Sequence, residues 1–251
     1  MKNFIFFFLV ISFTNTYGQQ KSTSLVNKII YTWSKVSDFN TQSINVLDTS
    51  DDIEDSLTKY NTTLSLLISS SEFSFLNSSD LQKIIDSTDI KVIISKDAKL
   101  KAISWMINND LPEPTCCNVF ILGTRKPQII SIGGTTGQDF GINVQLNKII
   151  DVSLKNKTFY LLIGSNKCGN LCIEKLASLY VVSDSLIVKC PKAFLSGTKY
   201  LDEVKFEYSL NGEKEPSFHV INTKLISPIF DRNKEKIVGN KVYEITGNVS
   251  N

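Results

Sequence analysis

The apolar residues of this chain change their spacing once, near Ile90, and that change limits the folds that the chain can adopt. Before it, one set of apolar residues recurs at steps of four, three, four and three, which is the spacing of one helix face. After it, apolar and polar residues alternate, which is the spacing of a half-buried strand. We therefore expect a helical region at 19–89 and a β-rich region at 90–251. The apolar residues with helical spacing before Ile90 are Ile53, Leu57, Tyr60, Leu64 and Leu67.

Individual helices can be placed within the first region. The apolar face above predicts a helix at about 51–69, and the preceding segment 48–52, Asp-Thr-Ser-Asp-Asp, offers capping side chains and acidic groups for its first turn. Ser78 or Ser79 can cap a short helix that runs to Asp86. A weaker helix before both is indicated by three apolar residues at steps of four, which are Leu25, Ile29 and Trp33.

The stretch VIISKDAKLKAISW, at 92–105, predicts the first β-hairpin. Its polar Lys-Asp-Ala-Lys segment, 96–99, separates two apolar runs. In the second run Ile103, Trp105 and Ile107 fall on one face of a strand, because successive side chains point to opposite faces. We expect Trp105 to be a packing residue rather than a ligand-binding one.

Further strands are indicated as far as residue 247. TFYLLIG is apolar on both faces, as a central strand would be, and turns are indicated at Asn222-Thr223 and Gly239-Asn240. About a dozen short strands with tight turns predict an antiparallel meander. The fold class is therefore α+β: N-terminal helices followed by a meander that forms a sandwich, a barrel or a propeller-like sheet. With no evident linker, we expect helices and sheet to pack as one unit.

The first residues, MKNFIFFFLVISFTNTYG, have the layout of a secretory signal peptide, with a basic start and a short apolar run. We expect cleavage after Gly18; an uncleaved N-terminal anchor is the alternative. No cysteine follows the run at the distance that lipid attachment needs, because the first is Cys116. The sequence thus predicts an exported protein, periplasmic or extracellular, without a lipid anchor and without a transmembrane span after cleavage.

The charge composition excludes an ordinary nucleic-acid binder. The formal net charge is +2, and the positive charge is almost entirely lysine, with arginine at Arg125 and Arg232. A nucleic-acid surface usually shows a basic stripe that contains arginines. We therefore expect a protein or glycan partner and no nucleic acid.

Five cysteines, an odd number, are disulfide candidates in an exported chain. At least one stays unpaired or pairs between chains; five choices of that residue and three pairings of the others leave 15 arrangements. Cys116 and Cys117 are adjacent, and neighbouring side chains on a strand point to opposite faces. We therefore expect them to pair elsewhere rather than with each other, one of them with the 168–172 loop. A zinc site would need a second pair of ligands, so a loop cystine is favoured over metal. The candidates are Cys116, Cys117, Cys168, Cys172 and Cys190.

The 95–105 hairpin resembles a pattern of uncharacterised secreted proteins of Bacteroidota, roughly Ser-x-Asp-Gly-Lys-hydrophobic-Arg-x-Tyr-Ser-Trp-Asp. The chain departs from that pattern at Ala98, Lys101 and Met106, which stand for glycine, arginine and aspartate. The resemblance extends to the order of elements from about residue 50, and it implies an envelope or extracellular setting. It implies no activity and no catalytic residue. The matching residues are Ser95, Asp97, Lys99, Leu100, Ser104 and Trp105.

A glycine-rich stretch, SIGGTTGQDFG, is interpreted as turns between strands, because no Gly-Lys-Ser/Thr sequence follows it as in a phosphate loop. The alternative is an exposed ligand loop with Gln138 and Asp139 at its tip. We expect no cofactor and no metal.

Catalytic residues are poorly represented. His219 is the single histidine, and a partly buried strand residue is a better interpretation than a Cys–His pair. Carboxylates at Asp202, Glu203 and Glu207 could support glycoside hydrolysis if two lay at a suitable separation. The favoured hypothesis is an exported, non-enzymatic binding or interaction module. An exported carboxylate-dependent hydrolase is the alternative, and an inhibitor or immunity-type protein a third.

Overall fold

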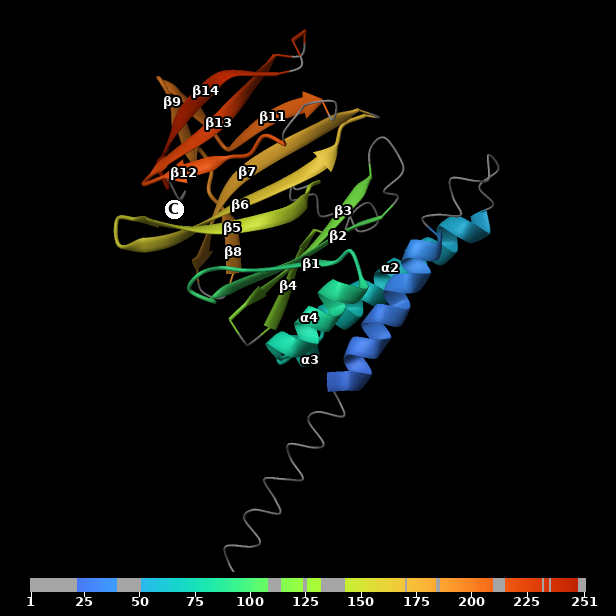
Figure 1. The fold of residues 1–251 in the computed structure, drawn as a ribbon. Helices are drawn as coiled ribbons and strands as arrows, with labels where there is room; N and C mark the ends of the chain where they lie inside the picture. Colours follow the sequence, from blue (N-terminus) through green and yellow to red (C-terminus); the bar gives the residue numbers. More distant parts are fainter. Residues whose placement is uncertain are drawn as a thin grey trace, which may run out of the picture.

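The fold is seen in a computed structural model, in which the helices precede the strands (Figure 1). A first helix covers residues 22–39, followed by α2 (Asp51–Ile68), α3 (Ser71–Ser74) and α4 (Ser78–Ser87). The predicted signal peptide, 1–18, lies outside the described residues. The structure describes residues 22–39, 51–107, 114–123, 126–131, 143–169, 171–183, 186–209, 215–231, 233–234 and 236–247.

The strands form three antiparallel sheets, so the predicted α+β fold with a β-meander is confirmed. The first sheet has the order β1-β2-β3-β4, the second β11-β7-β6-β5 with β8 also on β7, and the third β10-β9-β14-β13-β12. The strands are β1 (Lys91–Ile94), β2 (Leu100–Ile107), β3 (Thr115–Leu122), β4 (Lys126–Ser131), β5 (Gln145–Leu154), β6 (Lys157–Lys167), β7 (Cys172–Ser183), β8 (Leu186–Lys189), β9 (Phe194–Ser196), β10 (Lys199–Leu201), β11 (Glu203–Ser209), β12 (His219–Ile221), β13 (Lys224–Asp231) and β14 (Lys236–Ile245).

The molecule is a stack of four layers held by three cores. The helices pack on one face of the first sheet through residues such as Ile29, Leu64 and Trp105. The other face of the first sheet packs on the second, where Phe120 meets Tyr180 at a ring-centroid distance of 6.4 Å. The second and third sheets share the last core. In Figure 1 the layers run from the blue helices to the orange and red third sheet.

The burial of the apolar residues in the first helix agrees with their spacing in the sequence. Leu25, Ile29 and Trp33 are buried on one face of the first helix, as their spacing predicts. The cap of α4 was predicted wrongly: the side chain of Asn77, not Ser78 or Ser79, accepts from the N–H of Asp80 at 2.9 Å, because Asn77 is the extended residue before the helix. None of the helices in the described part of the chain is long and apolar enough to cross a membrane.

The 92–105 stretch is a hairpin, as predicted. β1 pairs with β2, and Trp105 lies fully buried in the core below the helices. Ala98, where the similar pattern has glycine, has a φ of 56°, a conformation that glycine adopts without strain.

Two carboxylates attach this hairpin to the second sheet. Asp151 of β5 accepts from the N–H groups of Lys96 and Asp97, both at 3.0 Å. Asp97 accepts from the hydroxyls of Ser95 at 2.8 Å and Tyr160 at 2.9 Å. Ser95 and Asp97, which carry much of the resemblance, thus have an architectural role.

Replacing Asp97 with asparagine is expected to lower stability at pH 7 and to matter less as the pH falls below about 4. Desolvation raises the pKa of Asp97, but donation by the Lys99 N–H and by the Ser95 and Tyr160 hydroxyls lowers it to a net value below the usual one. A carboxyl with a lowered folded-state pKa stabilises fully above its unfolded-state pKa, and that contribution is lost as the pH falls through the folded-state value.

Urea unfolding at pH 7, 5 and 3 measures this effect. A stability difference between wild type and Asp97→Asn that is as large at pH 3 as at pH 7 would contradict it. Asp55→Asn, at an exposed position of α2, serves as the control and should change stability by less than about 0.5 kcal/mol at each pH.

Two turn predictions had different outcomes. Asn222 and Thr223 connect β12 to β13, as expected. The prediction of a turn at Gly239-Asn240 is wrong, because both residues lie inside β14, opposite Ile229 and Pro228. The chain turns earlier, where Asp231 accepts from the N–H groups of Asn233 and Lys234. A short aspartate side chain can organise a turn in this way.

Candidate functional site

The carboxylates considered for hydrolysis do not form an acid–base pair. Glu203 and Glu207 lie on one face of β11, as expected, but four residues apart, which is about 13 Å along a strand. Paired glycosidase carboxylates are about 5–10 Å apart. Lys205 lies between the two in sequence, and its Nζ contacts Glu203 at 3.0 Å. Asp202 instead accepts from the N–H of Lys192 at 2.7 Å.

The electrostatics of Glu203 also oppose a role as a general acid. Desolvation raises its pKa, but ion pairs with Lys189, at 2.8 Å, and Lys205 lower it to a net value below the usual range. The pKa of Lys205 is lowered by desolvation, then raised above its usual value by Glu203 and Glu174. Both groups are therefore charged at neutral pH, which is typical of a structural ion network.

Two buried hydroxyls adjoin this network. Ser178 lies opposite Glu203, and Tyr180 lies opposite Lys189, all on the face of the second sheet that meets the first. Neither Ser178 Oγ nor Tyr180 Oη has a hydrogen-bond partner among the described residues. Burial and the nearby charge of Glu203 raise the pKa of Tyr180. This tyrosine therefore stays neutral and offers no base.

A buried lysine lies on the opposite face of β7. Lys175 forms an ion pair with Glu215 at 2.7 Å and donates to the carbonyl oxygen of Pro216 at 2.6 Å. Its Nζ is also 5.6 Å from the centre of the Tyr208 ring. Because its charge is paired and hydrogen-bonded, Lys175 anchors the segment before β12 rather than acting as a nucleophile.

The cysteines divide into one cystine and three buried thiols. Cys168 and Cys172 form a disulfide in the loop between β6 and β7, in keeping with the preference for a loop cystine. The expectation that Cys116 or Cys117 pairs with that loop is wrong, because Cys168 and Cys172 bond to each other. Cys116 and Cys117 are instead buried on β3, Cys117 in the core under the helices beside Asn61. Burial raises the pKa of Cys116 to about 12 and that of Cys190 to about 11, so these thiols are unreactive.

The other candidates supply no catalytic group. His219 is exposed on β12 rather than partly buried, whereas the three thiols are buried, so no Cys–His pair forms with them. Gln138 and Asp139, the predicted tip of a ligand loop, lie outside the described residues.

The third sheet has one largely exposed face that no core of the described residues covers. Its inner residues, such as Phe194, Leu225 and Tyr243, are buried against the second sheet. The side chains at alternate positions point the other way and belong to none of the cores of the described residues. We call this surface the outer face; it comprises Leu195, Tyr200, His219, Ile221, Lys224, Ile226, Val242 and Glu244.

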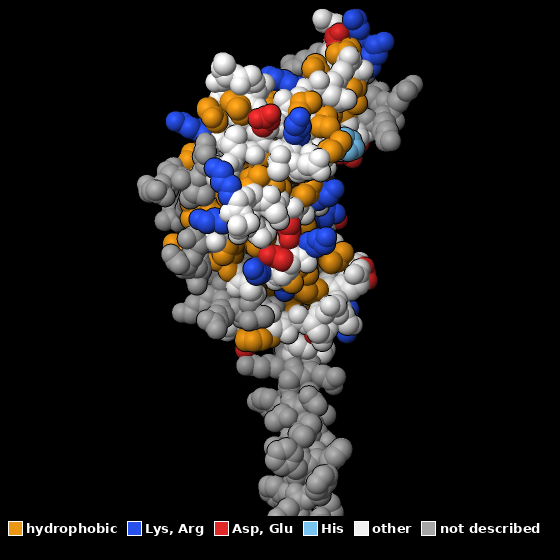
Figure 2. Space-filling view, turned by 90° about the vertical axis from the view of Figure 1, so that its left-hand side faces the viewer, with side chains coloured by type: hydrophobic (Ala, Val, Ile, Leu, Met, Phe, Trp, Pro, Cys, Tyr) orange, Lys and Arg blue, Asp and Glu red, His pale blue; other side chains and the backbone are white. Residues whose placement is uncertain are grey.

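The outer face combines exposed apolar side chains with a charged pair, Glu244 and Lys224, on the neighbouring strands β14 and β13. Tyr200, Ile221 and Val242 are 46%, 57% and 49% exposed, and Val242 lies directly opposite the half-buried Ile226. Lys224 and Glu244 face each other across β13 and β14. In Figure 2, hydrophobic side chains reach the surface of the upper part of the molecule among lysines and acidic groups. Several apolar side chains exposed together on one sheet face are typical of an interaction site.

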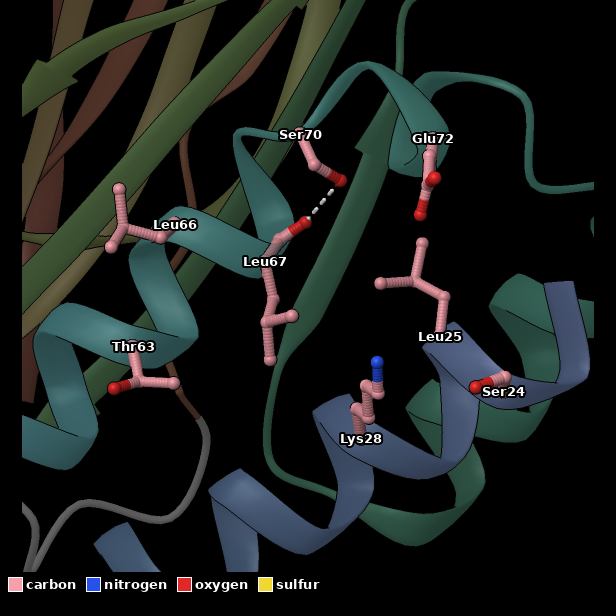
Figure 3. A pocket seen from close by; sticks show the side chains of 8 residues that line it. All are labelled: Ser24, Leu25, Lys28, Thr63, Leu66, Leu67, Ser70 and Glu72. Atoms are coloured by element: carbon pink, nitrogen blue, oxygen red, sulfur yellow. Dashed lines mark hydrogen bonds between the residues drawn. The ribbon is translucent and has the colours of Figure 1, made fainter. Parts of the chain in front are cut away.

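A separate groove lies in the helical layer, at the other end of the stack. It has a volume of ≈ 440 Å³ between the first helix and α2–α3. Figure 3 shows Leu25, Leu67 and Lys28 pointing into it. Lys28, Thr63, Leu66 and Glu72 are exposed, so the groove is open to solvent and lacks an enclosed polar site.

Comparison of the chain with protein-family models, with curated proteins and with solved structures gave no match. The outer face therefore has to be judged by its own chemistry. Sequence reasoning missed it, although one signal was present: in β14 the apolar residues Val242 and Tyr243 are adjacent, so both faces of that strand are apolar.

Proposed function

We propose that this protein is an exported, non-enzymatic binding module that contacts a partner through the outer face of its third sheet. The observation that carries the proposal is the exposure of Tyr200, Ile221 and Val242 on a sheet face that the described residues leave uncovered. The other sheets of the stack have both faces in a core. The signal-like N-terminus and the loop cystine support export.

The chemistry of the face favours a protein partner over a glycan. Sugar-binding surfaces generally present aromatic rings, whereas Ile221, Ile226 and Val242 are aliphatic and Tyr200 is the one aromatic residue of the face. An apolar strip on the partner would cover the aliphatic residues, and charged groups beside it would complement Lys224 and Glu244.

The proposal is tested by measuring the affinity of a purified partner. The tagged mature protein is used for capture from its native envelope, and a stoichiometric partner is then purified. The double variant Ile221→Lys, Val242→Lys is expected to weaken its binding by at least about tenfold, because burying two unpaired charges in an apolar contact costs more than about 1.4 kcal/mol.

Leu186→Lys is the matched control. Leu186 is 55% exposed, close to the 57% of Ile221, but it lies on β8 in the second sheet. This control should bind the partner as the wild type does. Unchanged affinity of the double variant, or a folded protein that captures no stoichiometric partner, would count against the proposal.

A further inference from the structure

The loop between β6 and β7 places two sulfur atoms beside a carboxylate of β11. Cys168 ends the β6 side of the loop and Cys172 begins β7, where it pairs with Ser209. Glu207 lies two residues before Ser209, on the same face as Cys172, and its Oε2 is 3.8 Å from Cys172 Sγ. One ligand atom from each of the three residues lies within 4.8 Å of the others.

The separation between Cys172 and Glu207 matches one edge of a tetrahedral metal site. With Zn–S bonds of about 2.3 Å and Zn–O bonds of about 2.1 Å, sulfur and oxygen ligands are about 3.6 Å apart. The separation between Cys172 Sγ and Glu207 Oε2 is close to that value. Two thiolates and one carboxylate are also a donor set that zinc accepts, with water completing the coordination.

The surrounding structure holds the three residues in place. The N–H of Cys168 donates to the carbonyl oxygen of Cys172 at 3.0 Å, which closes the loop independently of any bond between the sulfurs. β7 and β11 pair over the whole length of β11, from Glu203 to Ser209, which fixes the position of Glu207 relative to Cys172. All three residues are half-buried, so an ion can enter from solvent.

We propose that Cys168, Cys172 and Glu207 form a redox-gated site for a divalent ion of the zinc class. In the structure the two sulfurs are bonded to each other, and in that state they are not thiolate ligands. A dithiol reductant transfers two electrons and two protons to the cystine and is itself oxidised to a disulfide. The two thiols then release two protons as their sulfurs bind the ion.

The test uses Co²⁺ as the probe, because thiolate ligation of cobalt produces a characteristic near-ultraviolet absorption, and competition with Zn²⁺ then reports affinity. The whole mature protein is titrated in its oxidised form and after reduction with a phosphine. We expect thiolate–cobalt absorption at one equivalent in the reduced form alone, and its loss on addition of Zn²⁺.

Variants assign the ligands. Cys172→Ser should abolish the absorption, and Glu207→Gln should weaken Zn²⁺ binding by more than about tenfold. Glu174→Gln is the matched control, since Glu174 lies directly opposite Glu207 but outside the ligand set, and it should change affinity less than Glu207→Gln does.

Absence of thiolate–cobalt absorption in the reduced wild type would overturn the proposal. So would absorption that survives Cys172→Ser, because it would arise from other thiols. The outcome is independent of the proposed partner binding, since none of the three residues belongs to the outer face.

Discussion

Replacing Trp105 with alanine is expected to lower the free energy of unfolding by about 3–5 kcal/mol. The ring is fully buried between the first sheet and the helices. Its Nε1–H donates to Asn61 Oδ1 at 2.8 Å, and Asn61 is itself only 3% exposed. The substitution therefore opens a large cavity and also removes the indole donor from a buried amide. Urea unfolding followed by circular dichroism measures the effect.

Two further variants separate these contributions. Trp105→Phe keeps an aromatic ring but loses the N–H donor, and it should cost less than the alanine variant, about 1–3 kcal/mol. Tyr31→Ala, at a position that is 61% exposed on the first helix, should change stability by no more than about 0.5 kcal/mol. A Trp105→Ala protein as stable as the wild type would show that the ring does not hold the helices to the sheet.

Substituting Gly164 with alanine is expected to cost about 1–3 kcal/mol. A Cβ at this position of β6 would lie 2.5 Å from Val144 Cγ2 and 2.8 Å from the carbonyl oxygen of Gln145. The valine side chain can move, but the carbonyl belongs to the backbone at the start of β5, where the register shifts between Leu146 and Lys148. Relief of the clash therefore requires the two strands to separate locally, which thermal or urea unfolding will detect.

Gly239→Ala is the matched control, because Gly239 is also a strand glycine. A Cβ there meets no heavy atom within 4 Å. It should be neutral or raise stability by up to about 1 kcal/mol, since alanine reduces the freedom of the unfolded chain. Equal effects of the two glycine substitutions would mean that the close approach of β5 to Gly164 is not important for stability.

The candidate sites were predictable to different degrees. The shared face of Glu203 and Glu207 followed from their spacing of four residues, because strand geometry has a period of two. The same period places Lys205 beside Glu203, whereas Lys189 was not predictable. It is 14 residues away and meets Glu203 only because β8 and β11 both pair with β7. The 15 possible cysteine arrangements could be resolved only by the strand pairing that buries Cys116, Cys117 and Cys190 in separate environments.

By itself, the sequence determined the order of helices and strands, the hairpin at 92–105 and the burial of Trp105, because these depend on residues a few positions apart. Only the tertiary structure decided that the strands form three stacked sheets, that Asp97 bonds to Tyr160, and that the outer face lacks a covering layer in the described residues. The physical reason is that apolar periodicity specifies which face of a strand needs covering, whereas long-range packing selects the layer that covers it.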